Sequence, residues 1–101
     1  MSPIEKAARA LASLNGEDPE HLSAGQTRWT YYLAQVNAVV AAVHEPTILM
    51  KEAGSEVVRF VGAEESDMGR QSDAANIWRF MVDALREEGH QLLADHQISN
   101  G

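Results

Sequence analysis

The histidines are the side chains best suited to catalysis or metal binding near neutral pH, and their spacing decides whether they could bind a metal together. The chain has four, at His21, His44, His90 and His96. Two metal ligands on one helix stand three or four residues apart, whereas the nearest pair, His90 and His96, is six apart. Asp95 lies five residues from His90 and next to His96, so it completes no shared helical face. We therefore predict no metal site.

The remaining polar residues form no motif for catalysis or for cofactor binding. A serine–histidine–acid hydrolase needs a strand-turn nucleophile elbow or an equivalent scaffold, which a small helical domain does not offer. The acids Glu64, Glu65 and Asp67 lie in a segment without periodicity, where solvation is a simpler interpretation than acid–base chemistry. The glycines fit no phosphate-binding pattern. We predict no catalytic residue, no cofactor and no enzymatic activity.

The composition is typical of a soluble globular protein. The chain has 101 residues, of which 45 % are hydrophobic and 23 % charged, as expected for one domain. The absence of cysteine excludes disulfides, thiol catalysis and cysteine-ligated metals. The longest apolar run, residues 38–43, is far shorter than a membrane span, and the N-terminus lacks a signal-peptide layout. We expect a cytoplasmic protein with no membrane partner.

The formal charge of −7 is concentrated in the C-terminal half. Residues 1–44 carry three basic and four acidic side chains, and residues 45–101 carry five basic and eleven acidic ones. Binding to nucleic-acid phosphates needs clustered Lys and Arg, and the sequence has no such cluster, so we expect no direct nucleic-acid binding. The acidic half has three interpretations: it binds a basic partner, it imitates DNA, or it keeps the protein soluble. Solubility is the simplest of the three.

Two helices are expected in the first half of the chain. Residues 3–15 begin with a capping box, in which the side chains of Ser2 and Glu5 accept from each other's backbone amides. Residues 17–26 carry proline, glycine and acids without a sustained period, which is typical of a connector. Residues 27–44 then repeat apolar side chains at three- and four-residue spacing, until the residue before a proline breaks the helix.

Two further helices are expected in the second half, at residues 46–61 and 73–94. Gly54 lies inside the first of them, so the pattern leaves open whether that helix continues through it. Residues 62–72 contain glycines and acids without a period, which is typical of a flexible loop. Residues 96–101 are expected to form a frayed end.

These patterns predict an all-α fold, in which a compact bundle of about four helices forms a single domain. The tryptophans and tyrosines are candidates for lining a ligand pocket, but their helical spacing on apolar faces is more typical of a core. The core is expected to contain Leu11, Trp29, Leu33, Val36, Val40, Leu49, Ala53, Trp78, Met81 and Leu85.

The fourth helix is apolar over an unusually wide part of its circumference. Between Ile77 and Leu85, apolar side chains spread over about 200°, whereas a surface helix needs little more than half of that. Phe80 lies near one edge of this arc, where neighbouring helices cover it least. We expect the edge formed by Phe80, Ala84 and Glu87 to contact a second copy or another protein. A homodimer is the simpler version, because an isologous contact needs only self-complementarity.

Two stretches carry a resemblance to a known group of proteins. HEPTILMKEAG, at residues 44–54, and IWRFMVDAL, at residues 77–85, match the elements EP…M…AG and W-R-x-M-[IV]-D-A. In these elements the chain resembles small uncharacterised helical proteins of phages, prophages and alphaproteobacterial genomes. An SPIEKAARAL-like first helix and a Trp- and Tyr-containing second segment extend the resemblance over about residues 2–88. Phe80 stands where the resemblance implies a small residue. The resemblance implies a phage-linked context and provides no catalytic residues.

The sequence favours a non-enzymatic protein–protein interaction module. Its leading form is a phage-encoded factor that binds or inhibits a host or defence protein. The alternative is a structural or assembly accessory protein that forms a homo-oligomer, and an enzyme or small-ligand binder is the least favoured class. A defined partner in solution would favour the first, and a large homo-oligomer would favour the second.

Overall fold

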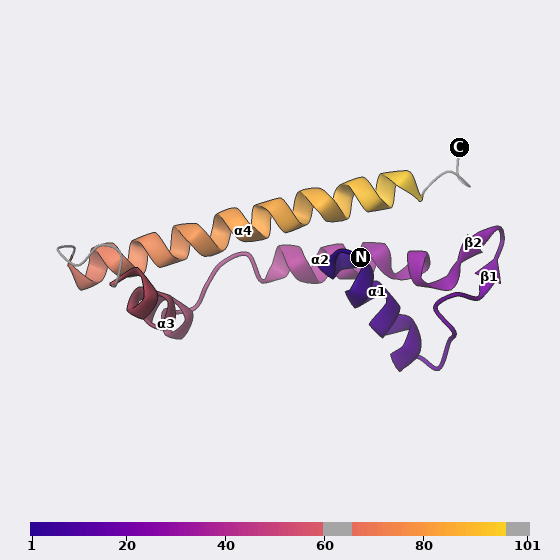
Figure 1. The fold of residues 1–101 in the computed structure, drawn as a ribbon, viewed down its shortest axis with the longest axis horizontal. Coiled ribbons are helices and arrows are strands. Elements are labelled where there is room, and N and C mark those ends of the chain that lie inside the picture. The colour runs from indigo at the N-terminus through magenta and orange to yellow at the C-terminus, as the bar shows by residue number, and fades with distance from the viewer. Residues whose placement is uncertain (60–65, 97–101) are drawn as a thin grey trace. The chain divides into compact units, whose positions relative to one another are not determined.

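The computed structural model, which describes residues 1–59 and 66–96, has an all-α fold, as predicted (Figure 1). Its described part contains four α-helices, one 3₁₀ helix and one two-stranded antiparallel sheet. The α-helices are α1 (Pro3–Leu14), α2 (Leu33–Ala42), α3 (Ile48–Val58) and α4 (Asp67–Asp95). The other elements are the strands β1 (Leu22–Ser23) and β2 (Gln26–Thr27) and the 3₁₀ helix η1 (Arg28–Tyr32).

The contacts between residues divide the chain into two units. Unit 1 comprises Met1–Ala41 and Ala84–Gly101, and unit 2 comprises Ala42–Asp83. Helix α4 therefore contributes its first part to unit 2 and its second part to unit 1. That the chain forms a single domain stays a prediction. None of the described helices is both long enough and apolar enough to cross a membrane.

Helix α1 begins and ends close to the predicted limits. The Ser2 hydroxyl accepts from the Glu5 amide at 3.2 Å, and a proline occupies the first helical position. The other half of the predicted capping box is replaced by an ion pair, in which Arg9 Nε donates to the Glu5 carboxylate at 2.9 Å. One face of the helix is buried in unit 1, through Ile4, Ala8 and Ala12.

The predicted connector at residues 17–26 contains a short β-hairpin, which the sequence did not indicate. Strands β1 and β2 pair antiparallel across a two-residue turn. The turn residues Ala24 and Gly25 have φ angles of 52° and 82°, both in the left-handed region that such turns require. Alanine is an uncommon choice there, so the usual Asn-Gly or Asp-Gly signal is missing.

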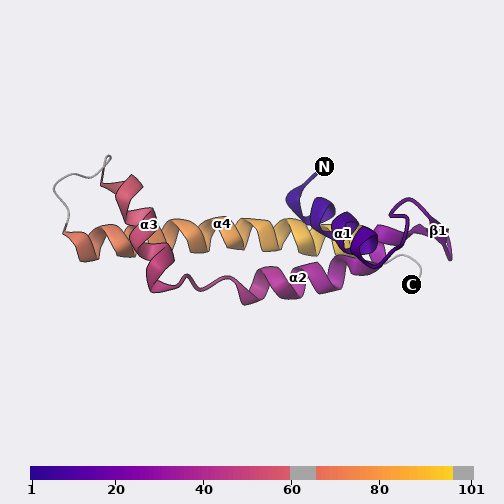
Figure 2. The ribbon, with the colours of Figure 1, turned by 90° about the horizontal axis from the view of Figure 1, so that it is seen from below.

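The predicted helix at residues 27–44 is two elements, η1 followed by α2, which ends at Ala42 before the proline. Within unit 1, α2 runs alongside the C-terminal part of α4 (Figures 1 and 2). Asn37 Nδ2 donates to the Gly89 carbonyl at 3.1 Å across this pair. A Cβ at position 89 would overlap the Asn37 side chain, so a glycine in α4 allows the close approach.

Helix α3 is continuous through Gly54, which answers the question that the sequence left open. The predicted limits of 46–61 were too wide at the start, because Thr47 is the N-cap and its hydroxyl accepts from the Met50 amide at 3.2 Å. A Cβ built on Gly54 would lie 2.7 Å from the Cβ of Ala74 in α4. The glycine therefore permits close packing of two helices and does not end one. Residues 60 and 61 lie outside the described range.

Helix α4 begins six residues earlier than the predicted start at residue 73. Ser66 caps it, since its hydroxyl accepts from the Gly69 amide at 3.0 Å. The predicted loop at residues 62–72 is therefore wrong for residues 67–72, because one glycine costs a helix only about 1 kcal/mol. Residues 62–65, and 97–101 of the predicted frayed end, lie outside the described residues.

Candidate functional site

The predicted core is largely correct in unit 1 and wrong in unit 2. Four of its members in unit 1 are buried, namely Trp29, Leu33, Val36 and Val40. Leu11 and Leu85, also in unit 1, are half-buried, and so is Trp78 in unit 2. The other three predicted members in unit 2 are exposed, among them Leu49 at 77 % and Met81 at 65 %. The exposure of these side chains in unit 2 was therefore not predicted from the sequence.

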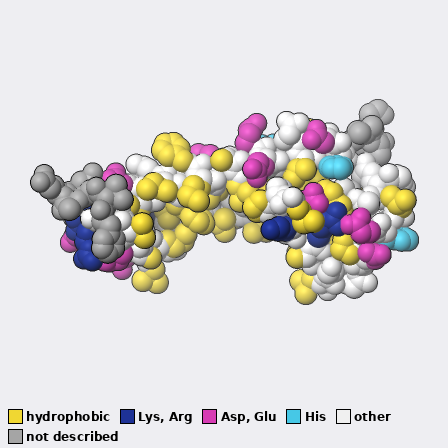
Figure 3. Space-filling view, viewed as in Figure 1, with side chains coloured by type: hydrophobic (Ala, Val, Ile, Leu, Met, Phe, Trp, Pro, Cys, Tyr) yellow, Lys and Arg dark blue, Asp and Glu magenta, His cyan; other side chains and the backbone are white. Residues whose placement is uncertain are grey.

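Unit 2 exposes most of its large apolar side chains. Helix α3 has no buried residue at all, although five of its eleven residues are large and apolar. Figure 3 shows hydrophobic side chains gathered over α3 and the part of α4 beside it. Seven of these side chains on the two helices are exposed: Ile48, Leu49, Met50, Val57, Ile77, Phe80 and Met81.

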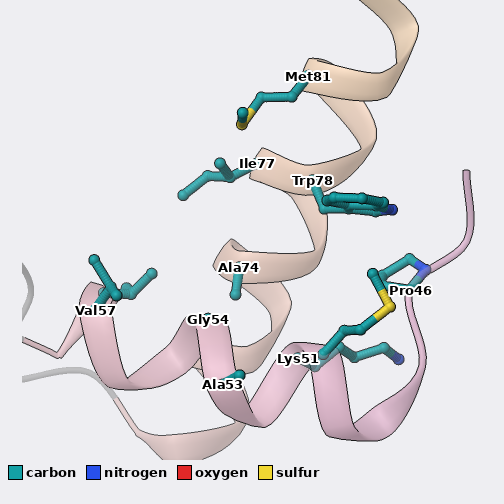
Figure 4. A pocket seen from close by; sticks show the side chains of 11 residues that line it. Pro46, Lys51, Ala53, Gly54, Val57, Ala74, Ile77, Trp78 and Met81 are labelled. Carbon is teal, nitrogen blue, oxygen red and sulfur yellow. The ribbon is translucent and has the colours of Figure 1, made fainter. Parts of the chain in front are cut away.

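A groove of about 370 Å³ lies between α3 and α4, within unit 2 (Figure 4). Its floor is formed where Gly54 of α3 meets Ala74 of α4. The side chains along it are apolar except for Lys51. We call it the α3–α4 groove; its large apolar side chains are Met50, Val57, Val58, Ile77, Trp78 and Met81.

A second hollow, of about 410 Å³, continues this apolar surface toward Phe80. It shares Val57, Val58 and Ile77 with the α3–α4 groove, so the two hollows are adjacent parts of one surface. Phe80 is 73 % exposed at its edge. The hollow is also lined by Asp73 and Asn76, but its surface is as apolar as that of the groove.

The connection between α2 and α3 is tied to α4, and these ties set the position of α3. Trp78 Nε1 donates to the Val43 carbonyl at 2.9 Å. Two residues further along the connection, the Glu45 carboxylate accepts from Arg79 Nε at 3.2 Å and Nη2 at 3.0 Å. His44 Nε2 lies 2.9 Å from a carboxylate oxygen of Asp83. Together these contacts fix the position of Pro46, which lines the groove, and with it the start of α3.

The ion pair between Arg79 and Glu45 has a consequence for pH. Hydrogen bonding from Arg79 lowers the pKa of Glu45 below its ordinary value of 4.5. A lowered pKa in the folded state stabilises folding above about pH 4.5, and this contribution is lost as the pH falls through the lowered value. The ion pair between Arg79 and Glu45, which holds the connection against α4, should therefore weaken only at acidic pH.

We expect Arg79→Gln to return the pKa of Glu45 toward 4.5, because it removes the charged donor. An NMR titration of the Glu45 side-chain carboxyl carbon measures this directly. Arg59→Gln is the matched control, since Arg59 pairs with Glu56 at 3.2 Å and not with Glu45. An unchanged titration in Arg79→Gln would show that the ion pair is absent in solution.

The three predicted interface residues are exposed but do not share one hollow. Phe80 belongs to unit 2 and lines the second hollow, next to the α3–α4 groove. Ala84 and Glu87 belong to unit 1, where they line a different hollow together with Met1 and Ser2. The sequence therefore indicated Phe80 but missed its neighbours on α3. The sequence did contain a signal for these neighbours, because α3 is as rich in large apolar residues as the fourth helix.

The groove offers apolar contact and little else chemically. Lys51 is the one charged residue among those that line it. Two histidines outside it have structural contacts: the His96 ring packs edge-on against Trp29 at 5.2 Å between centroids, and His44 contacts Asp83. Among the described residues, no three His, Asp or Glu side chains gather in an arrangement suited to a metal ion. The arrangement therefore suits binding of an apolar surface.

Comparison with known protein families, with curated proteins and with solved structures finds no significant match for this chain.

Proposed function

We propose that this chain is a non-enzymatic protein–protein interaction module that binds through the α3–α4 groove and the adjoining surface at Phe80. The observation that carries the proposal is that α3 has no buried residue while three of its five large apolar side chains line a groove. Monomeric soluble proteins rarely leave apolar patches of this kind uncovered, and such patches are typical of binding surfaces. The resemblance to phage and prophage proteins makes a host or defence protein the leading class of partner.

The alternative is a structural or assembly accessory protein that associates with itself. It is favoured by the same surface, because a helix without any buried residue needs cover whenever the chain is folded. The two forms share the binding surface and differ in its occupant, so one set of variants serves to test both.

We expect Val57→Glu to abolish binding through this surface, because Val57 is exposed and borders both hollows. A charge there would have to be desolvated on binding without a partner charge. The measurement is covalent cross-linking in producing cells, followed by identification of every chain linked to the tagged protein. A linked chain that Val57→Glu loses is a ligand of the surface.

The matched control is Met68→Glu, which adds the same charge at a side chain that is 82 % exposed in unit 2 but borders neither hollow. It should keep the cross-linked chains. If Val57→Glu and the parent link to the same chains in the same amounts, the groove is not a binding surface and the proposed function is wrong.

A further inference from the structure

We propose that the occupant of the α3–α4 groove is a second copy of this chain, with Phe80 of each copy inserted into the groove of the other. The inference rests on the proposed function in its alternative form, in which the chain associates with itself. It also moves the self-association surface from the edge at Ala84 and Glu87 to α3 and the part of α4 in unit 2.

The exposed apolar area reaches the lower limit of what a specific dimer buries. Burying one large aliphatic or aromatic side chain removes on the order of 100 Å² of apolar surface from water. The five exposed ones that line the groove or the adjoining hollow are roughly 60 % exposed on average, so they offer about 300 Å². If roughly 60 % of the interface is apolar, this area corresponds to about 500 Å² per partner, or about 1,000 Å² in total, which is the lower limit for a specific interface.

Helix α3 needs a partner that covers it whenever the chain is folded, and a second copy of the chain meets this requirement. Helix α3 has eleven residues and none of them is buried. Isolated helices shorter than about 12–15 residues are marginal in water, so α3 depends on packing. A copy of the same chain is always available at synthesis. Two helix pairs brought face to face by a two-fold axis would form a four-helix core.

The groove and Phe80 fit each other in size and position. An apolar cavity of about 150 Å³ is enough for a benzene ring, and the groove has about 370 Å³. Phe80 is 73 % exposed and borders the same surface through the hollow that shares Val57 and Ile77 with the groove. An isologous contact can therefore place each phenyl ring in the facing groove at the same time.

Charge distinguishes a second copy from a basic partner. Residues 42–83 carry four basic and eight acidic side chains by sequence, a formal charge of −4. Two copies therefore repel around their apolar contact, and added salt should strengthen their association by screening. A basic partner would be attracted, and salt would weaken its binding. The sign of the salt effect thus identifies the occupant.

The test is sedimentation equilibrium of the full chain at about 0.05 and 0.5 M NaCl, where the Debye length falls severalfold. We expect a dimer that tightens with salt. Phe80→Glu and Val57→Lys should each weaken it by at least about tenfold. An equimolar mixture of the two variants should regain association, because each mixed dimer sets Glu at position 80 against Lys at position 57 and keeps one native contact. Met68→Glu should dimerise like the parent, and circular dichroism should show that every variant keeps its helices.

A parent that stays monomeric at all concentrations would overturn the inference, and so would a mixture that associates no better than its components. In either case, the proposed function would still hold if the parent cross-links to a protein other than itself and Val57→Glu does not. If Val57→Glu changes no association of any kind, both fail together.

Discussion

Replacing Trp29 with alanine should lower the free energy of unfolding by about 3–5 kcal/mol, the largest loss expected for a single substitution in this chain. Trp29 is 5 % exposed and lies at the centre of the packing in unit 1. The Arg9 guanidinium stands 5.1 Å from the centre of its ring, and the His96 ring meets it edge-on. The alanine variant would lose these contacts and leave a cavity that the backbone of η1 cannot close.

Urea denaturation followed by circular dichroism, at a fixed chain concentration, measures the loss. The matched control is Trp78→Ala, because the chain has two tryptophans and Trp78 is only half-buried. We expect it to cost about 1–2 kcal/mol, chiefly through the hydrogen bond to Val43 and the packing at the groove. Equal losses for the two variants would mean that Trp29 does not have the buried position described.

Replacing Gly54 with alanine should lower the free energy of unfolding by about 1–2 kcal/mol, although alanine is the better helix former by about 1 kcal/mol. The added Cβ would lie 2.7 Å from the Cβ of Ala74, which is attached directly to the backbone and cannot turn away. Helix α3 would have to move off α4, and the α3–α4 groove would change shape with it.

The same urea denaturation tests this prediction. The control is a double variant in which the methyl group is moved from residue 74 to residue 54. In the double variant with Gly54→Ala and Ala74→Gly, the new Cβ would be 3.8 Å from the Cα of residue 74, an ordinary contact. The double variant should therefore recover part of the stability that Gly54→Ala loses. If Gly54→Ala stabilises the protein instead, the two helices do not approach as closely as described.

The proposed binding surface was only partly predictable from the sequence. The width of the apolar arc on the fourth helix indicated Phe80, and the structure places Phe80 beside the groove. The other half of the surface comes from α3, in which the sequence predicted only Leu49 and Ala53, both as core residues. Periodicity alone treats Leu49 of α3 and Leu33 of α2 alike, yet the first is 77 % exposed and the second is fully buried.

The sequence by itself determined the local structure of this protein. Apolar spacing at three and four residues gave the four helices, a serine and a proline set the start of α1, and Pro46 ended α2, because these effects act within a few residues of chain. The distribution of charge along the chain likewise follows directly from the sequence. The glycine at position 54 was ambiguous at this level, since the same residue can end a helix or allow close packing.

Only the tertiary structure decided which apolar faces are covered. A pattern shows that a helix has an apolar side, but burial depends on whether another element lies against that side. In unit 1, α1 lies against η1 and covers the side that carries the buried Trp29. In unit 2, α3 and α4 meet at Gly54 and Ala74 and leave the flanking side chains exposed. The groove exists because two small residues bring the helices together, while the described residues of unit 2 leave the large side chains beside them uncovered.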